Sequence, residues 1–255
     1  MNIKLLHSTP LHLAAYGART CWDSTCKSDT DIQARCFECD ELYDPFLAEC
    51  PFCEHENTHH NEMVCGEKDK ELIDRVGNKF KHQSVLEHVS YTFSIKGVSR
   101  ALLQELSRHR LSSPSVRSTR YTLKVLKTEE PFCTYGIDAG SLYLTITDIQ
   151  RECANKYLVF TGKESVDVKS ICALEMLRQE IVSGTSNDLA KYCLPEAFKT
   201  ELQFTINMRS LQNFLSLRSD KSALWEIREL SHALHDSLPE EHKYMFIGFI
   251  KDVVC

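Results

Sequence analysis

The sequence lacks any apolar run of the ~18 to 20 residues that a membrane-spanning helix needs. Its first ten residues also lack the long apolar region of a secretory signal peptide, so we expect a cytoplasmic protein without a membrane partner. No internal repeat or low-complexity tract is present, and no Gly-x-Ser-x-Gly elbow marks a nucleophilic serine. Membrane proteins, repeat arrays and serine hydrolases of that type are thereby disfavoured.

An excess of positive charge is also lacking. The chain carries 30 Lys and Arg against 36 Asp and Glu, a net charge of -6. Affinity for a nucleic-acid backbone depends on many clustered cations, so we expect no nucleic-acid partner. With 255 residues, of which 42% are hydrophobic, the chain can bury a sizeable core in one large domain or two small ones.

Cysteine, in contrast, is abundant, with twelve in the chain. Four of them form two Cys-x-x-Cys pairs separated by ten residues: Cys36, Cys39, Cys50 and Cys53. Four thiolates at this spacing can close a tetrahedron around zinc, which predicts a zinc-ribbon-like segment over residues 26–65. Oxidised pairs or an iron site of rubredoxin type are the alternatives, and other possible ligands follow nearby: His55, His59, His60 and Cys65. A segment of about 35 to 40 residues is too small to bury a core without a metal.

Hydrophobic periodicity predicts alternating helices and strands. Helical spacing covers residues 68–81, a stretch from residue 98, parts of 145–185, residues 211–218 after a possible N-cap at Ser210, and 222–238. Strict alternation predicts strands at 89–95 and 201–208. Pro114 is expected to keep the segment after the second helix in a loop.

One segment has a charge that contrasts with the rest of the chain. Between Leu106 and Thr128 there are six Arg or Lys and no Asp or Glu. Guanidinium groups bind phosphate through paired hydrogen bonds, which indicates an anionic ligand, although a solvated basic loop is the alternative. Arg218 continues the apolar stripe of its helix, so it needs a carboxylate or an anionic ligand nearby.

These residues belong to a longer motif. Arg108-His109-Arg110, followed after seven residues by Ser118-Thr-Arg120-Tyr, resembles the signature of the flavin-dependent thymidylate synthases. The resemblance continues in His82-Gln-Ser84-Val-Leu-Glu87-His88, in Leu194-Pro195 and in residues 205–218. It covers residues 1 to about 25 and 65–250, and only the cysteine-rich segment between them looks foreign.

The resemblance implies an α+β fold, with helices packed on a central, mainly antiparallel sheet in a single domain over residues 1–255. It also implies a homotetramer in which several subunits build each active site. Members of this family bind FAD, NADPH, methylenetetrahydrofolate and deoxyuridylate (dUMP). They make thymidylate (dTMP) by reductive methylation without a cysteine nucleophile.

The resemblance also implies roles for single residues. Cofactor-binding positions are Ser84, Arg108, His109, Arg110, Asn207, Arg209 and Asn213 at the flavin, and His82 where folate or nicotinamide stacks on it. Nucleotide-side positions are Glu105, Ser118, Arg120 and Lys191. Arg218 matches the catalytic arginine against the uracil ring, where a fixed cation stabilises developing negative charge. Val116, Lys191 and Ser222 depart from the commoner family pattern.

Two other functions are compatible with parts of the sequence. One is a different FAD or nucleotide oxidoreductase on the same scaffold, which would be expected to lack the uracil-facing Arg218. The other is a zinc-ribbon binding module with a degenerate catalytic body, which would be expected to carry substitutions in the Arg-His-Arg motif. Both the motif and Arg218 are intact.

Overall fold

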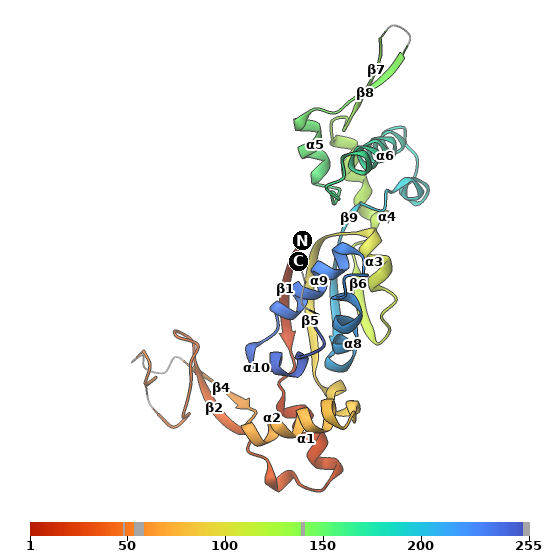
Figure 1. Ribbon diagram of the computed structural model, residues 1–255. Helices are drawn as coiled ribbons and strands as arrows, with labels where there is room; N and C mark the ends of the chain where they lie inside the picture. The colour runs from red at the N-terminus through yellow and green to blue at the C-terminus, as the bar shows by residue number, and fades with distance from the viewer. Residues whose placement is uncertain (48, 54–58, 139–140, 252–255) are drawn as a thin grey trace.

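The computed structural model describes residues 1–47, 49–53, 59–138 and 141–251. Its central feature is a four-stranded antiparallel sheet in the order β1-β5-β9-β6. The strands are β1 (Asn2–Ser8), β5 (Ser90–Ser99), β6 (Ser112–Val116) and β9 (Lys199–Asn207). The chain thus has the expected α+β architecture around an antiparallel sheet (Figure 1).

The two middle strands pair their apolar residues directly. Phe93 lies opposite Phe204, and Ile95 lies opposite Leu202. All four are buried, because alternate residues of a strand point to one face and this face meets the helices. Both strands had been predicted from their alternation, and they extend a few residues further than predicted.

Helices and short turns surround the sheet and share its core. Those nearest the sheet are α1 (His12–Cys21), α2 (Glu67–Ile73), η2 (Asp74–Lys79), η3 (Gln83–His88), α3 (Arg100–Leu106), α8 (Met208–Arg218), α9 (Trp225–Asp236), α10 (Glu240–Lys243) and η6 (Tyr244–Phe246). The short η1 (Thr25–Lys27) follows α1 and has no buried residue. Gly77 lies in η2, where a Cβ would come within 2.7 Å of the Leu86 side chain. The glycine therefore lets η3 pack closely against η2.

A second group of helices forms its own core at one end of the molecule (Figure 1). It contains α4 (Thr119–Thr122), η4 (Leu123–Thr128), α5 (Asp148–Asn155), α6 (Glu164–Val182), α7 (Asn187–Ala190) and η5 (Lys191–Cys193), with a hairpin of β7 (Thr134–Asp138) and β8 (Ser141–Thr145). We call this part the helical unit. Among the described residues no helix is both long and apolar enough to cross a membrane.

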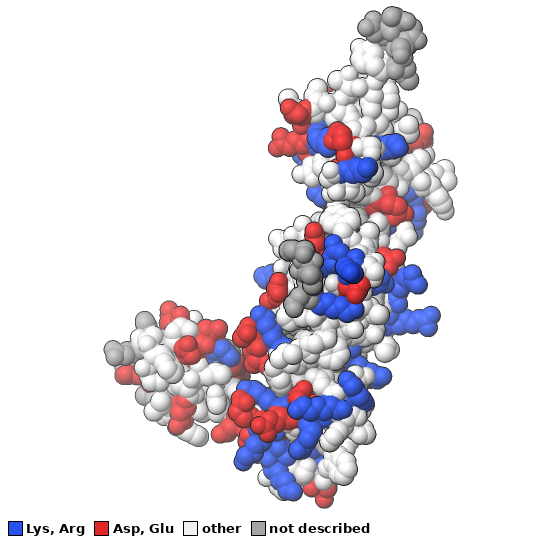
Figure 2. Space-filling model, viewed as in Figure 1, with Lys and Arg blue, Asp and Glu red and all other residues white. Residues whose placement is uncertain are grey.

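The cysteine-rich segment forms a projecting arm, which we call the cysteine arm (residues 31–64; Figure 1). Its three-stranded antiparallel sheet has the order β3-β2-β4, with β2 (Asp31–Cys36), β3 (Leu42–Tyr43) and β4 (His59–Val64). Among its described residues, the core consists of Ala34, Cys36, Tyr43 and Cys50, with Cys39 and Cys53 packed against them. Acidic side chains predominate on its visible face (Figure 2).

A buried ion pair lies where the arm joins the body. The guanidinium of Arg19, in α1, donates to the carboxylate of Asp69, in α2, which is fully buried. The hydroxyls of Ser28 and Thr30 donate to the same carboxylate. These bonds tie the residues before β2 to two helices of the body.

Three local predictions differ from the structure. Pro114 lies within strand β6, not in a loop, because β6 is an edge strand and has partners only on one side. The helix predicted over 68–81 changes from α-helix to π-helix at Asp74. The N-cap of α8 is Asn207 and not Ser210: the Asn207 side chain accepts a hydrogen bond from the Ser210 N–H at 2.8 Å.

Candidate active site

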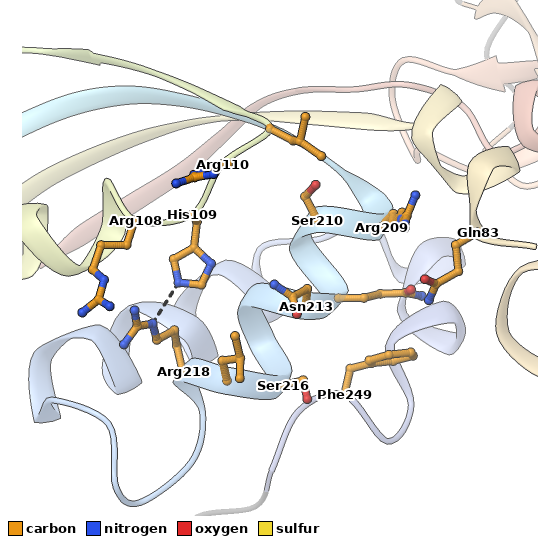
Figure 3. Close-up of a pocket in the computed structure, with 13 residues that line it drawn as sticks. Gln83, Arg108, His109, Arg110, Arg209, Ser210, Asn213, Ser216, Arg218 and Phe249 are labelled. Atoms are coloured by element: carbon orange, nitrogen blue, oxygen red, sulfur yellow. Dashed lines mark hydrogen bonds between the residues drawn. The ribbon is translucent and has the colours of Figure 1, made fainter. Parts of the chain in front are cut away.

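The main candidate site is a cavity of about 850 Å³ between α8 and the segment that follows α3. In α8, Arg209, Asn213, Ser216 and Leu217 line it, because residues three or four apart share one face of a helix. The complete lining is Gln83, Arg108, His109, Arg110, Leu111, Arg209, Ser210, Gln212, Asn213, Ser216, Leu217, Arg218 and Phe249. Figure 3 shows these residues from both segments around the same space.

The charge of this lining is entirely positive. Among the residues that the structure describes, it contains four arginines and no carboxylate. Within the described part of the chain, neither Arg108 nor Arg110 has a hydrogen-bond or ion-pair partner, whereas Arg209 donates to Glu87 at 2.6 Å. Leu111 follows the motif with a φ of 61°, a left-handed conformation that is uncommon for such a residue and turns the chain toward β6. The cavity is therefore suited to an anion.

Arg218, the last residue of α8, is held at one side of the cavity. Its Nη1 donates to Oε2 of Glu105 at 2.8 Å, and its Nε donates to Nε2 of His109 at 2.8 Å (Figure 3). The sequence required a partner for this cation on the apolar stripe, and Glu105 supplies it. Burial, with a contribution from Arg218, lowers the pKa of His109 to about 4.

The structure brings together six of the residues that the sequence placed at the flavin or the uracil: Arg108, His109, Arg110, Arg209, Asn213 and Arg218. Glu105 joins them through its ion pair with Arg218. His82 and Ser84 are absent from the lining, although Gln83 between them contributes to it. Asn207 caps α8 and thereby fixes the start of the helix that carries Arg209 and Asn213.

Three further predicted residues, Ser118, Arg120 and Lys191, lie outside this cavity. Ser118 precedes α4 and Lys191 follows α7, and these two short helices pack against each other in the helical unit. Arg120 donates from Nε to Oδ1 of Asp188 at 2.7 Å. Within one chain, Ser118, Arg120 and Lys191 therefore lie apart from the residues predicted at the flavin, whereas Glu105, also predicted at the nucleotide, lies beside the cavity.

Several lining residues were not predicted from the sequence. Gln83 lies between two predicted positions, so its motif could have indicated it. Ser216 follows the i, i+3 pattern from Asn213, which is also a usable signal. Phe249 comes from the segment after η6, and no local pattern marks it.

The four predicted metal ligands converge in the cysteine arm. Their Sγ atoms all lie within 4.8 Å of one another. The Sγ atoms of Cys36 and Cys53 are 3.5 Å apart, and those of Cys39 and Cys50 are 3.6 Å apart. Zinc–sulfur bonds of about 2.3 Å in a tetrahedron place sulfurs about 3.8 Å apart, so the geometry fits zinc.

Among the described residues, the other possible ligands are not part of this cluster. The Tyr43 hydroxyl is 2.9 Å from Nδ1 of His59, and Cys65 is buried near Asp69 with its pKa raised to about 11, mainly by burial. His60 lies in β4 with half of its side chain exposed, near Glu62. His55 lies outside the described residues.

Comparisons with known proteins identify the family to which the chain belongs. Residues 4–242 match the family described as "Thymidylate synthase complementing protein". The flavin-dependent thymidylate synthase of Campylobacter jejuni is 50% identical over 246 residues, covering 96% of both chains, and that of Wolinella succinogenes is 49% identical. A crystal structure of thymidylate synthase X from Helicobacter pylori with FAD and dUMP matches with a TM-score of 0.76 at 42% identity, covering 99% of this chain and 100% of that one. The chain therefore belongs to the flavin-dependent thymidylate synthase family.

Proposed function

We propose that the protein makes thymidylate from deoxyuridylate by reductive methylation, with FAD as cofactor, methylenetetrahydrofolate as methylene donor and NADPH as reductant. The observation that carries this proposal is the arginine-lined, carboxylate-free cavity with Arg218 fixed at its side. The Helicobacter pylori relative, crystallised with FAD and dUMP, supports the assignment of both ligands.

The cavity residues fit FAD by charge and by hydrogen-bonding type. Arg108 and Arg110 have no acidic partner among the described residues, and their guanidinium groups suit a pyrophosphate. Ser210, Ser216 and Asn213 add hydroxyl and amide groups along the same wall. When bound there, FAD would supply hydride-transfer chemistry between NADPH and the methylene-bearing uracil.

Arg218 then acts on the pyrimidine. The Nη1 bond to Glu105 and the Nε bond to His109 hold the guanidinium in one orientation. A cation positioned in advance stabilises the negative charge that develops on uracil as its C5 becomes nucleophilic. This electrostatic activation replaces attack by a protein thiol.

The separate group at Ser118, Arg120 and Lys191 supports an assembly of more than one subunit, as the proposed homotetramer requires. If these residues bind the deoxyuridylate phosphate, they must reach a cavity that they do not line in their own chain, so a second subunit would supply them. The exposed surface is 14,999 Å², whereas a compact monomer of 29.3 kDa exposes roughly 11,500 Å². The projecting arm and helical unit account for an extended shape, which is typical of a subunit that buries surface in an assembly.

We also infer that the cysteine arm binds one zinc ion through Cys36, Cys39, Cys50 and Cys53. All four positions of the tetrahedron would be filled by protein, which is the arrangement of a structural site and not a catalytic one. The core formed by the described residues of the arm is too small to hold three strands by hydrophobic burial. Zinc would supply the missing stabilisation, and the flavin chemistry would proceed without it.

The test is an activity measurement on the purified protein. We expect flavin absorbance bands at roughly 375 and 450 nm and NADPH oxidation that accelerates when deoxyuridylate is added. Thymidylate should form when methylenetetrahydrofolate is also present. A colourless protein that cannot be reconstituted with FAD would refute the proposal, and flavin-dependent NADPH oxidation without thymidylate would indicate a different oxidoreductase.

A further inference from the structure

The bond between Arg218 and His109 fixes the protonation state of the histidine. Arg218 Nε donates to His109 Nε2 at 2.8 Å. An arginine side chain has only donors, so Nε2 must present a lone pair. A neutral imidazole carries its single proton on the other nitrogen, and the ring proton of His109 therefore lies on Nδ1.

The surroundings of the ring favour the same state. Two cations, Arg218 and Arg108, lower the pKa of His109, and only the Glu105 carboxylate raises it. Burial also disfavours the charged form, because the ring packs edge-on against Phe214 with centroids 4.8 Å apart. Adding a second proton at Nε2 would remove the acceptor for Arg218. It would also make the imidazole a cation that repels the Arg218 guanidinium.

The second ring nitrogen has a different orientation. In Figure 3 it turns away from Arg218 and faces the side of the cavity where Ser210 and Asn213 lie. No described residue makes a hydrogen bond with it. His109 thus lies between the arginine that faces the uracil and the wall that we assign to the flavin.

We propose that His109 is a neutral positioning residue, which accepts a hydrogen bond from Arg218 through Nε2 and donates its Nδ1–H to the flavin. The inference rests on the proposed function for the identity of that acceptor. It links the two halves of the site: the imidazole that contacts the cofactor also aims the guanidinium that activates the pyrimidine. It further excludes Nε2 of His109 as a proton donor in the reaction.

A direct test is ¹⁵N NMR of the FAD-bound protein labelled selectively at histidine, with the His109→Gln spectrum used to assign the signal. We expect His109 to show a protonated Nδ1 and an unprotonated Nε2, unchanged between about pH 6 and 8. Free imidazole side chains titrate near pH 6.5, so a titration in that range would overturn the proposal. An Nε2-protonated tautomer would also overturn it. Neither result would bear on whether the wild-type protein makes thymidylate.

Two variants separate the two bonds. In His109→Gln the amide oxygen can replace Nε2 as the acceptor for Arg218, whereas His109→Asn keeps a polar group only near the place of Nδ1. With FAD saturating, we expect the Asn variant to lose about tenfold or more in kcat for thymidylate, the usual range for a hydrogen bond to a charged group, while the Gln variant loses clearly less. The Gln variant should instead need more FAD for half-maximal activity. Equal kcat losses in the two variants would contradict the positioning role.

Discussion

Arg120 and Asp188 form a two-pronged ion pair, with Nε 2.7 Å from Oδ1 and Nη2 3.2 Å from Oδ2. Asn187, at the start of α7, also donates to the backbone carbonyl of Arg120 at 2.7 Å. The short helix after Ser118 is thus locked to the short helix before Lys191. The segments that carry Ser118, Arg120 and Lys191 are therefore held together, although they lie apart from the cavity of their own chain.

The first prediction concerns this group. Arg120→Ala should raise the KM for deoxyuridylate by about tenfold or more, because it removes a charged contact to the phosphate, while FAD remains bound. Steady-state kinetics with varied deoxyuridylate would measure this. Arg117→Ala is the matched control, since Arg117 carries the same charge in the same segment but bonds to the Lys199 carbonyl and Glu201. An equal KM for the two variants would argue against the phosphate role of Arg120.

A second prediction concerns Arg218. Arg218→Ala should keep FAD but lose on the order of 10²-fold or more in thymidylate formation, since one preorganised charge at the uracil is removed. The flavin spectrum reports cofactor retention, and product formation reports the chemistry. Turnover at the wild-type rate would refute the assignment of Arg218.

Much of the fold follows from local patterns in the sequence. The strands β5 and β9 were predictable because each alternates buried and exposed side chains along its length, and α9 because its apolar residues recur at helical spacing. Strand β6 was not predictable, because Pro114 signals a loop and only the position of the strand at the sheet edge makes the proline acceptable.

The candidate site was predicted only in part. The Arg-His-Arg motif and Arg218 marked the arginines of the cavity, but the bond between His109 and Arg218 joins residues 109 positions apart. No local pattern encodes such a contact. Phe249 is a similar case, since it reaches the cavity from the C-terminal segment and follows no periodic stripe.

A third prediction tests the absence of a thiol nucleophile. Single Cys→Ser changes at Cys133, Cys153, Cys172 and Cys193 should each leave thymidylate formation in place, and none of these four lines the arginine-rich cavity. The same is expected for Cys255, which lies outside the described residues. Burial raises the pKa of Cys133 to about 11, which keeps that thiol protonated at neutral pH. A variant that folds, binds FAD and deoxyuridylate, and is inactive would contradict this mechanism.

A fourth prediction concerns the buried ion pair at the root of the cysteine arm. Asp69→Asn should lower the free energy of unfolding by about 3 to 5 kcal/mol, because the buried Arg19 cation loses its counter-ion. The control Glu164→Gln breaks an exposed pair with Arg151 and should lower the free energy of unfolding far less, because solvent screens that pair. Denaturant unfolding of both variants measures the two losses in free energy of unfolding. Equal losses would contradict the stabilising role of the buried pair.

The same pair should make stability depend on pH. Burial acts to raise the pKa of Asp69, but the hydrogen bonds from Ser28, Thr30 and Arg19 outweigh it and leave this pKa below its usual value. The stabilisation is therefore complete above the ordinary aspartate pKa of about 3.9 and is lost as the pH falls toward the lower folded-state value. The difference in free energy of unfolding between the wild type and Asp69→Asn should become smaller only below about pH 4.

The last prediction concerns zinc. Elemental analysis of protein purified under reducing conditions should find close to one zinc per chain, because four thiolates fill a tetrahedral site. The double change Cys36→Ser with Cys39→Ser should lose the metal and make the arm more sensitive to proteolysis, since little hydrophobic core remains to order it. The matched control is Cys21→Ser with Cys26→Ser, which alters two exposed cysteines outside the cluster and should keep the zinc.

FAD binding should be retained in both double variants, because no described residue of the cysteine arm lines the cavity. Protein without metal, or a flavin-binding defect as severe as that of Arg108→Ala, would contradict a purely structural zinc site.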